Sequence, residues 1–317
     1  MLSRTADHLY WMARHMERAE NTARILDVTN RMSLLPKDTA LAEQEWGAAL
    51  EMTACSQAFA ARDGQRSAEP ILRFMTIDTE NPSSIVSCLR TAREKGRAVR
   101  GTITSEMWES LNSTWLEVQH LHLDEERLRS GDIGTWFDWV KERSHLFHGV
   151  TQGTILHDEA LHFIHLGTFM ERADNTARTL DVKYHELLSA PTGEGEPVDY
   201  YQWSALLRSV SAFEAYRKVY RDVIVPWRVA ELLVLRADMP RSLHACLNTI
   251  DDVLARIPGE TGREAARQAG DLHARLHYGR MEDILQEGLH EYLEDFLVRV
   301  NDLMLEINRS FLVPVCV

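Results

Sequence analysis

Apolar side chains recur at intervals of three and four residues along almost the whole chain, the spacing of one buried helix face. The C-terminal region shows this most clearly, with apolar residues at Met281, Ile284, Leu285, Leu289, Tyr292, Phe296, Val300, Leu303 and Ile307. No segment shows a convincing strand alternation. The pattern predicts helices over residues 5–33, 40–62, 82–100, 104–129, 132–150, 155–189, 199–221, 226–236, 240–256, 262–278 and 281–311.

Turn-forming residues are sparse between these helices. The chain has 16 Gly and 9 Pro in 317 residues, about 8% against an expected ~12%, and this favours long helices over many short strands. Asn81 followed by Pro82 predicts a helix start, with Asn as the N-cap and Pro at the first helical position. The one linker-like stretch is 190–199, which reads APTGEGEPVD.

Two segments of the chain are nearly the same. Met16–Val28 reads MERAENTARILDV and Met170–Val182 reads MERADNTARTLDV, so eleven of thirteen positions are identical at an offset of 154 residues. Two further matches follow in the same order at offsets of 157 and 158, namely 46–50 with 203–207 and 81–91 with 239–249. Ordered matches at a nearly constant offset indicate a tandem duplication.

The length of the chain suits such a duplication, because a single core stops growing at about 250–300 residues. We therefore expect an all-α fold, a tandem-duplicated helical bundle with two pseudo-symmetric repeats of about 150 residues. The first repeat is expected over residues 1–150 and the second over 155–317, as two bundles or as one continuous core.

On a helix the repeated segment has an apolar and a polar face. The apolar stripe of the first copy is Met12, Met16, Ala19, Ala23 and Leu26. The polar positions kept in both copies are the candidate binding residues, Glu17, Arg18, Asn21, Arg24 and Asp27, matched by Glu171, Arg172, Asn175, Arg178 and Asp181. Most of the two halves has diverged, so their retention favours a buried or interfacial network over a solvated face with weak ion pairs.

Two roles for this network stay open. Two such helices related by a pseudo-twofold axis would lock together through reciprocal Arg–carboxylate pairs. Alternatively, the arginines and asparagines form a binding surface for a carboxylate, a phosphate or a peptide backbone.

The repeated motif also resembles that of the alpha-E family, named for its helical content and its Glu-Arg motif. Further segments that fit the family are Ala92–Arg100, Glu106–Asn112, Leu207–Lys218 and Met239–Leu247, so the resemblance covers essentially the whole chain. The resemblance implies that this protein is a partner of circularly permuted ATP-grasp proteins, to which members of the family are sometimes fused. It also implies an association with transglutaminase-like proteins and proteasome-like peptidases, and hence an ATP-dependent amide-ligating or peptide-modifying system. The family offers no settled catalytic residues, and any ATP chemistry would be supplied in trans.

Composition narrows the function classes further. The formal charge of −13, from 35 Lys and Arg against 48 Asp and Glu, argues against nucleic-acid binding, which depends on cationic contacts to phosphate. No apolar run approaches the ~18 residues of a membrane-spanning helix, and the charged N-terminal segment does not read as a signal peptide. The four dispersed cysteines are typical of free thiols in a reducing compartment. We expect a cytoplasmic protein that contacts neither nucleic acid nor membrane.

Two Glu-x-x-His pairs have the spacing found in di-iron helical bundles. Glu159 and His162 lie on a helix that is apolar on nearly all sides, whereas Glu287 lies opposite the apolar stripe of the helix that carries His290. The two pairs do not match each other in the repeat, and each lacks an identified carboxylate from another helix. We therefore assign no metal ligand, no catalytic residue and no cofactor, and keep Glu159 and His162 as an alternative.

The sequence thus predicts an accessory or partner subunit of an ATP-grasp-type amide-ligase system. The duplicated Glu-Arg-Asn-Arg stripes would bind the partner or a peptide substrate. The alternatives are a stand-alone helical-bundle enzyme, metal-dependent or metal-free, and a non-catalytic scaffold.

Overall fold

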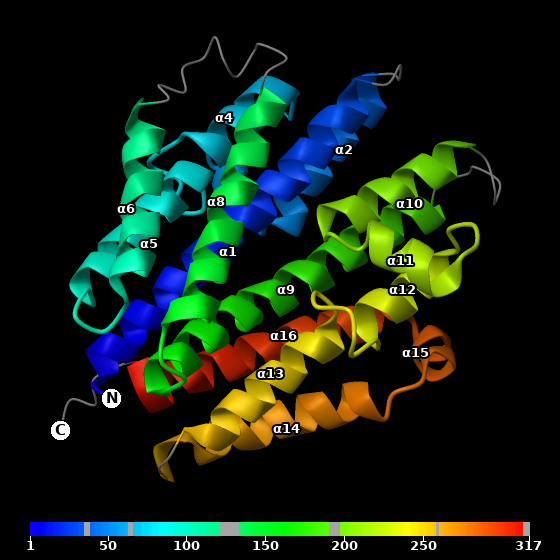
Figure 1. Cartoon of the computed structure of the whole chain (residues 1–317). Coiled ribbons are helices and arrows are strands. Elements are labelled where there is room, and N and C mark those ends of the chain that lie inside the picture. The colour runs from blue at the N-terminus through cyan, green and yellow to red at the C-terminus, as the bar shows by residue number, and fades with distance from the viewer. Residues whose placement is uncertain (35–38, 63–65, 121–132, 190–196, 258–259, 313–317) are drawn as a thin grey trace. The chain divides into compact units, whose positions relative to one another are not determined.

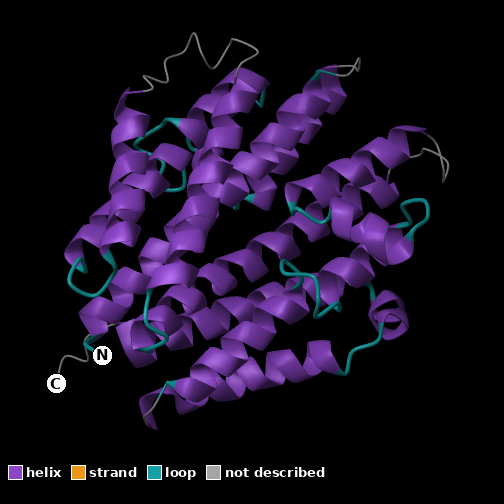
Figure 2. Cartoon of the chain, in the orientation of Figure 1, coloured by secondary structure: helices purple, strands orange, loops and turns teal. Residues whose placement is uncertain are grey.

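The computed structural model describes residues 1–34, 39–62, 66–120, 133–189, 197–257 and 260–312. Every regular element in these ranges is helical (Figures 1 and 2), so the all-α expectation is confirmed. The chain divides into two compact units, one of Met1–Glu171 with Leu312–Val317 and one of Arg172–Phe311. The expected repeat boundaries and the duplication itself stay predictions from sequence.

The first unit is organised around its N-terminal helix, α1, which packs against α5 and α8. The helix α6 packs in turn against both α5 and α8. Its helices are α1 (Ser3–Ser33), α2 (Thr39–Met52), α3 (Ser56–Ala60), α4 (Ala68–Thr76), α5 (Ile85–Ala98), α6 (Ser105–His120), α8 (Ile133–Thr154) and the start of α9 (Glu159–Ser189).

The second unit begins inside α9 and has its most extensive contacts between α13 and α14. Its further helices are α10 (Pro197–Ser209), α11 (Phe213–Tyr220), α12 (Pro226–Val234), α13 (Leu243–Arg256), α14 (Arg263–His277), α15 (Met281–Glu287) and α16 (Leu289–Ile307). A short 3-10 turn (Glu260–Gly262) precedes α14, and a π turn (Asn308–Leu312) follows α16.

The predicted apolar stripe of α1 forms part of the core. All five of its residues, from Met12 to Leu26, are at most 1% exposed. The corresponding residues of α9, Met170, Ala173, Ala177 and Leu180, are fully buried. Helical periodicity therefore identified the inward face of both long helices correctly.

Three predicted helices are interrupted in the structure. The range 40–62 breaks between α2 and α3 at Ala54, and 199–221 breaks between α10 and α11 at Ser211, where φ is 54° and 55°. The range 281–311 breaks at Gly288, where φ is 110°. A residue with positive φ ends an α-helix. Alanine and serine rarely adopt a positive φ, so the residue types at Ala54 and Ser211 gave no sign of the first two breaks. The apolar periodicity gave no sign of them either. Residues 121–129 of the predicted helix 104–129 lie outside the described part.

The predicted start of the helix over 82–100 was also wrong. Ser84 is the N-cap, and its hydroxyl accepts a hydrogen bond from the Ser87 N–H at 3.2 Å. Asn81 instead forms a turn before the helix. Its side-chain oxygen accepts from the Ser83 N–H, and its amide donates to the Phe74 carbonyl. Asn81 is an N-cap residue type that here stabilises the preceding turn instead.

The two units repeat local structure at matched positions. The helix α4 begins at Ala68 and α12 at Pro226, and α5 begins at Ile85 and α13 at Leu243, 158 residues later in both cases. Both pairs also end 158 residues apart. Ser242 caps α13 as Ser84 caps α5, with its hydroxyl accepting from the Ala245 N–H. The helix bounds therefore recur at the offset seen in the sequence.

Across the described residues, no helix is both long enough and apolar enough to cross a membrane.

Candidate functional site

The first copy of the repeated motif lies in the middle of α1, and the structure buries most of its polar residues. Glu17 is fully buried, Asn21 and Asp27 are 3% and 4% exposed, and Arg18 and Arg24 are half-buried. A helix with buried polar groups on several sides must satisfy them with partners from neighbouring helices. The polar face of α1 is therefore a packed network and not a solvated surface.

Glu171 on α9 is the most strongly held carboxylate in the first unit. Arg14 Nε and Nη2 donate to Glu171 Oε2, both at 2.8 Å, and Arg18 donates from Nε to Oε1 at 2.5 Å and from Nη2 to Oε2 at 2.9 Å. Burial by itself raises the pKa of Glu171, but the charges and hydrogen bonds of Arg18 and Arg14 outweigh it and lower the pKa to about 2. Glu171 is therefore ionised at neutral pH.

The α1 and α9 backbones approach closely just beside this ion pair. A Cβ at Gly167, one turn before Glu171, would overlap the carbonyl oxygen of Tyr10 and would lie 3.2 Å from the Ala13 Cβ. Only glycine permits this approach. The glycine therefore sets the distance over which Arg14 and Arg18 reach the carboxylate.

Sequence reasoning missed Arg14. It is buried, it lies with its guanidinium carbon 4.8 Å from the Trp11 ring centre, and its Nη1 donates to the Tyr10 hydroxyl at 3.4 Å. The position that matches it at an offset of 154 is Thr168. A comparison of the two copies selects only residues that both copies keep, so it could not select Arg14.

A second polar cluster, with Glu17 and Glu20 buried at its centre, lies between α1 and α8. Arg24 donates from Nε to Glu20 Oε1 at 2.8 Å, and the hydroxyl of Ser144 donates to Glu20 Oε2 at 2.6 Å. Arg24 Nη2 lies 2.9 Å from His145 Nε2, and His148 Nε2 lies 3.2 Å from Glu17 Oε2. Glu20 was not predicted as a site residue, although its counterpart Asp174 is also acidic.

The ligand-type atoms of Glu17, Glu20 and His148 all lie within 4.8 Å of one another. Both oxygens of Glu20, however, already accept hydrogen bonds, one from Arg24 and one from Ser144. A cation bound here would have to displace the guanidinium. The geometry suits an ion-paired network better than a metal centre.

Asp27 ends the first stripe and is shared by two cations. Arg31 donates to both of its oxygens, at 2.8 and 3.1 Å, and Lys141 on α8 donates to Oδ2 at 2.9 Å. The hydrogen bond to Asp27 is the main reason that the pKa of Arg31 is raised. These contacts attach the C-terminal part of α1 to α8.

In the second unit the other copy forms partly equivalent contacts. Arg178 donates to Asp174 at 2.9 and 3.0 Å, so the residue four positions earlier orients it, as Glu20 orients Arg24. Asp181 lies 2.6 Å from His290 Nδ1 on α16, and this hydrogen bond raises the pKa of His290. Asn175 is 8% exposed, and Arg172 is half-buried.

The alternative metal pair receives no support from this geometry. Glu159 Oε2 accepts from the N-terminal ammonium of Met1 at 2.7 Å. Within the described residues, neither Glu159 nor His162 belongs to a group of three side chains placed to share a cation. Glu287 and His290 likewise belong to none there, and His290 faces Asp181.

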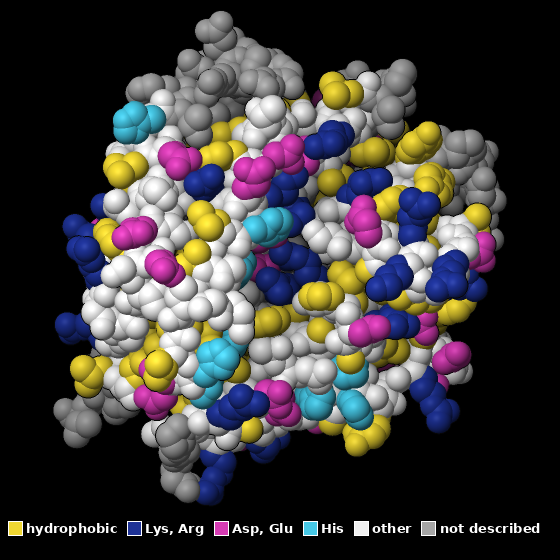
Figure 3. Space-filling view, viewed as in Figure 1, with side chains coloured by type: hydrophobic (Ala, Val, Ile, Leu, Met, Phe, Trp, Pro, Cys, Tyr) yellow, Lys and Arg dark blue, Asp and Glu magenta, His cyan; other side chains and the backbone are white. Residues whose placement is uncertain are grey.

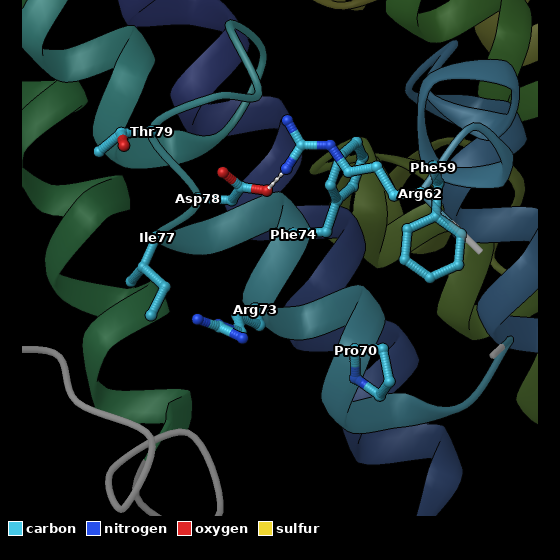
Figure 4. Close-up of a pocket in the computed structure, with 8 residues that line it drawn as sticks. All are labelled: Phe59, Arg62, Pro70, Arg73, Phe74, Ile77, Asp78 and Thr79. Carbon is cyan, nitrogen blue, oxygen red and sulfur yellow. Dashed lines mark hydrogen bonds and ion pairs between the residues drawn. The ribbon is translucent and has the colours of Figure 1, made fainter. Parts of the chain in front are cut away.

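A separate cavity of about 450 Å³ lies in the first unit, beside α3 and α4 (Figure 4). It combines the aromatic rings of Phe59 and Phe74 with an ion pair between Arg62 and Asp78. Arg73 also lines it. None of the motif residues contributes to its wall.

The fold and the site thus define an all-helical protein whose repeated Glu-Arg motif lies in buried and half-buried ion-pair networks. The family model described as "a predicted alpha-helical domain with a conserved ER motif" matches residues 1–312, and the chain belongs to this family, Alpha-E.

Curated relatives occur in mycobacteria. An uncharacterised protein of Mycobacterium bovis and one of Mycobacterium tuberculosis are each 24% identical over 316 residues, which is 94% of this chain and 35% of the relative. The chain therefore spans about a third of the length of these relatives. No solved structure matches it significantly.

Proposed function

We propose that this protein is an accessory or partner subunit of an ATP-grasp-type amide-ligase or peptide-modifying system. A circularly permuted ATP-grasp protein is the expected partner, together with a transglutaminase-like protein and a peptide substrate in the same system. The proposed compartment is the cytoplasm.

The observation that carries the proposal is the matched anchoring of two arginines. Arg24 on Glu20 and Arg178 on Asp174 are each oriented by a carboxylate one turn earlier, and their side chains are 12% and 33% exposed. A guanidinium that is held in place and still reaches the surface loses little entropy on binding a carboxylate or a peptide carbonyl. Both copies present this arrangement, which suits recognition of a partner or peptide at two points.

Family membership and length add to this support. The family resemblance implies that members are partners of ATP-grasp proteins and that some members are fused to an ATP-grasp protein. The mycobacterial relatives are about three times longer than the segment they share with this chain. That difference in length fits a family in which the helical part operates beside a second protein.

Affinity purification of the tagged protein from its own host, followed by mass spectrometry, tests the proposal. Recovery of an ATP-grasp protein in a one-to-one ratio is the expected result. The recovered complex should then form amide bonds in the presence of ATP. Recovery of the chain alone at low salt and high yield would contradict the proposal and favour a stand-alone activity.

A further inference from the structure

Three histidines of the second unit converge between α13 and α14. His244 is the second residue of α13, and His273 and His277 are four residues apart on one face of α14. One ring nitrogen from each lies within 4.8 Å of the others, and the ring centres are 5.5 to 5.8 Å apart. Figure 3 shows histidine side chains gathered on the surface where α13 and α14 lie in Figure 1.

The polar contacts of two of these rings indicate which nitrogen carries the proton. His244 Nδ1 lies 2.8 Å from the carbonyl oxygen of Leu235, which only accepts, so Nδ1 is the donor and Nε2 keeps its lone pair. His273 Nδ1 lies 3.3 Å from the Asp251 carboxylate, which favours the same tautomer. A backbone carbonyl and a carboxylate are the partners that metal-bound histidines use on their outer nitrogen.

The inner nitrogens of these two rings are buried. His244 is 6% exposed, and neither its Nε2 nor that of His273 has a hydrogen-bond partner among the described residues. Two buried nitrogen atoms without a hydrogen-bond partner carry a desolvation cost. A cation between them removes that cost for both.

We propose that His244, His273 and His277 bind one divalent transition-metal ion, and that Zn²⁺ is the ion that fits best. Three neutral imidazoles are a characteristic ligand set for zinc, with Zn–N distances of about 2.0–2.1 Å. Ligands at that distance in a tetrahedron lie about 3.3 Å from one another, which small side-chain rotations reach from the present spacing. His277 is exposed, so the fourth position faces solvent and takes water or a ligand atom.

The first unit lacks this site at matched positions. At the offset of 158 residues that relates α5 to α13, the three histidines correspond to Val86, Trp115 and Gln119. None of these residue types supplies a nitrogen lone pair. The site therefore belongs to the second unit alone, and valine is the natural replacement for testing His244.

Titration of the metal-stripped full chain with ZnCl₂, followed by calorimetry, tests the proposal. We expect one zinc per chain with a Kd below about 1 µM. Replacement by Co²⁺ should give the intense visible absorption of a tetrahedral site. His277→Ala and His244→Val should each weaken binding by at least about 100-fold, and Asp251→Asn, which alters an outer partner, by about 10- to 100-fold.

Matched variants separate this site from the rest of the molecule. His157→Ala removes an exposed histidine of the first unit and should leave zinc binding unchanged. Undiminished binding in His277→Ala would overturn the proposal, as would a failure to bind zinc at micromolar concentration. Loss of binding in His148→Ala alone would also overturn it, because it would place the metal beside Glu17. His277 lies at the surface, so its variant should keep the helical circular dichroism spectrum of the wild type.

Discussion

Glu171 receives hydrogen bonds from both Arg14 and Arg18, and Glu171 and Arg14 are both buried. Removal of one partner of a buried ion pair leaves the other charge without compensation, which costs about 3–5 kcal/mol. We expect Glu171→Ala to lower the free energy of unfolding by about that amount in urea denaturation, since Arg14 then stays buried without its carboxylate. Arg14→Ala should cost less than Glu171→Ala, because Arg18 still pairs with Glu171.

An exposed ion pair provides the control for this effect. Arg267 and Glu264 lie 2.6 Å apart on α14, and Arg267 is 67% exposed, so Arg267→Ala should leave the free energy of unfolding nearly unchanged. Equal losses for Arg14→Ala and Arg267→Ala would show that the buried pair contributes no more than a surface pair.

His15 predicts a dependence of stability on pH. Burial, followed by the nearby charge of Arg18, lowers the pKa of His15 from 6.5 to about 3 in the folded protein. The unfolded chain therefore binds a proton below pH 6.5 that the folded chain does not. The contribution of His15 to stability is complete above pH 6.5 and is lost as the pH falls toward 3.

The rate of this loss is at most about 1.4 kcal/mol per pH unit. The variant His15→Gln should show a shallower decline of the unfolding free energy between pH 6.5 and pH 5 than the wild type. The variant His157→Gln, which changes an exposed histidine, should keep the wild-type slope. A wild-type slope in His15→Gln would contradict the assignment of a neutral buried imidazole.

At the scale of elements, the approach of α1 and α9 depends on one glycine. Gly167→Ala places a methyl group against the Tyr10 carbonyl, and overpacking of this kind costs about 1–3 kcal/mol. Thermal denaturation should show a lower Tm. The ion pair between Glu171 and Arg14 should also contribute less to the free energy of unfolding, because the carboxylate moves away from Arg14.

Gly149→Ala on α8 is the matched substitution. Apart from its chain neighbours and the backbone of α8 itself, no atom lies within 4 Å of the added Cβ, so the better helix propensity of alanine should stabilise the protein by about 0.5–1 kcal/mol. The two substitutions are chemically identical and should change Tm in opposite directions. A destabilised Gly149→Ala variant would contradict the packing described for α8.

The sequence predicted the long helices well and their breaks poorly. Periodicity identified the buried stripe of α1 from Met12 to Leu26 because a one-sided apolar pattern is a direct record of burial. The breaks at Ala54 and Ser211 depend on a positive φ that tertiary packing imposes on ordinary residues. The nine-residue helix α4 (Ala68–Thr76) was missed, whereas the equally short α12 was predicted, because Pro226 marks its start.

The sequence also predicted only part of the candidate site. Comparison of the two copies selected Glu171, Arg18 and Arg24, which the structure places in buried ion pairs. It missed Arg14 and the three histidines of α13 and α14, because each occurs in one half only. The spacing of His273 and His277 on one helix face was the available signal for the latter.

At the scale of the whole molecule, the two units share helix bounds and differ in chemistry. The capping serines Ser84 and Ser242 recur 158 residues apart, whereas His244 replaces Val86 at the same offset. The predicted duplication would explain this pattern, with side chains replaced locally so that one half acquires the proposed zinc site and the other lacks it. The anchored arginines, which both halves keep, belong to the shared framework.

The most direct test of the proposed function combines Arg24→Ala with Arg178→Ala in the tagged protein. The double variant should lose the ATP-grasp partner while it keeps the helical spectrum of the wild type and a cooperative melt. Its Tm should be lower, because the buried Glu20 loses the guanidinium of Arg24. The matched control, Arg97→Ala with Arg267→Ala, removes two arginines from exposed pairs with Glu94 and Glu264 and should retain the partner. Full recovery of the partner by the Arg24 and Arg178 double variant would contradict the proposal, and unfolding of that variant would show that these arginines are architectural.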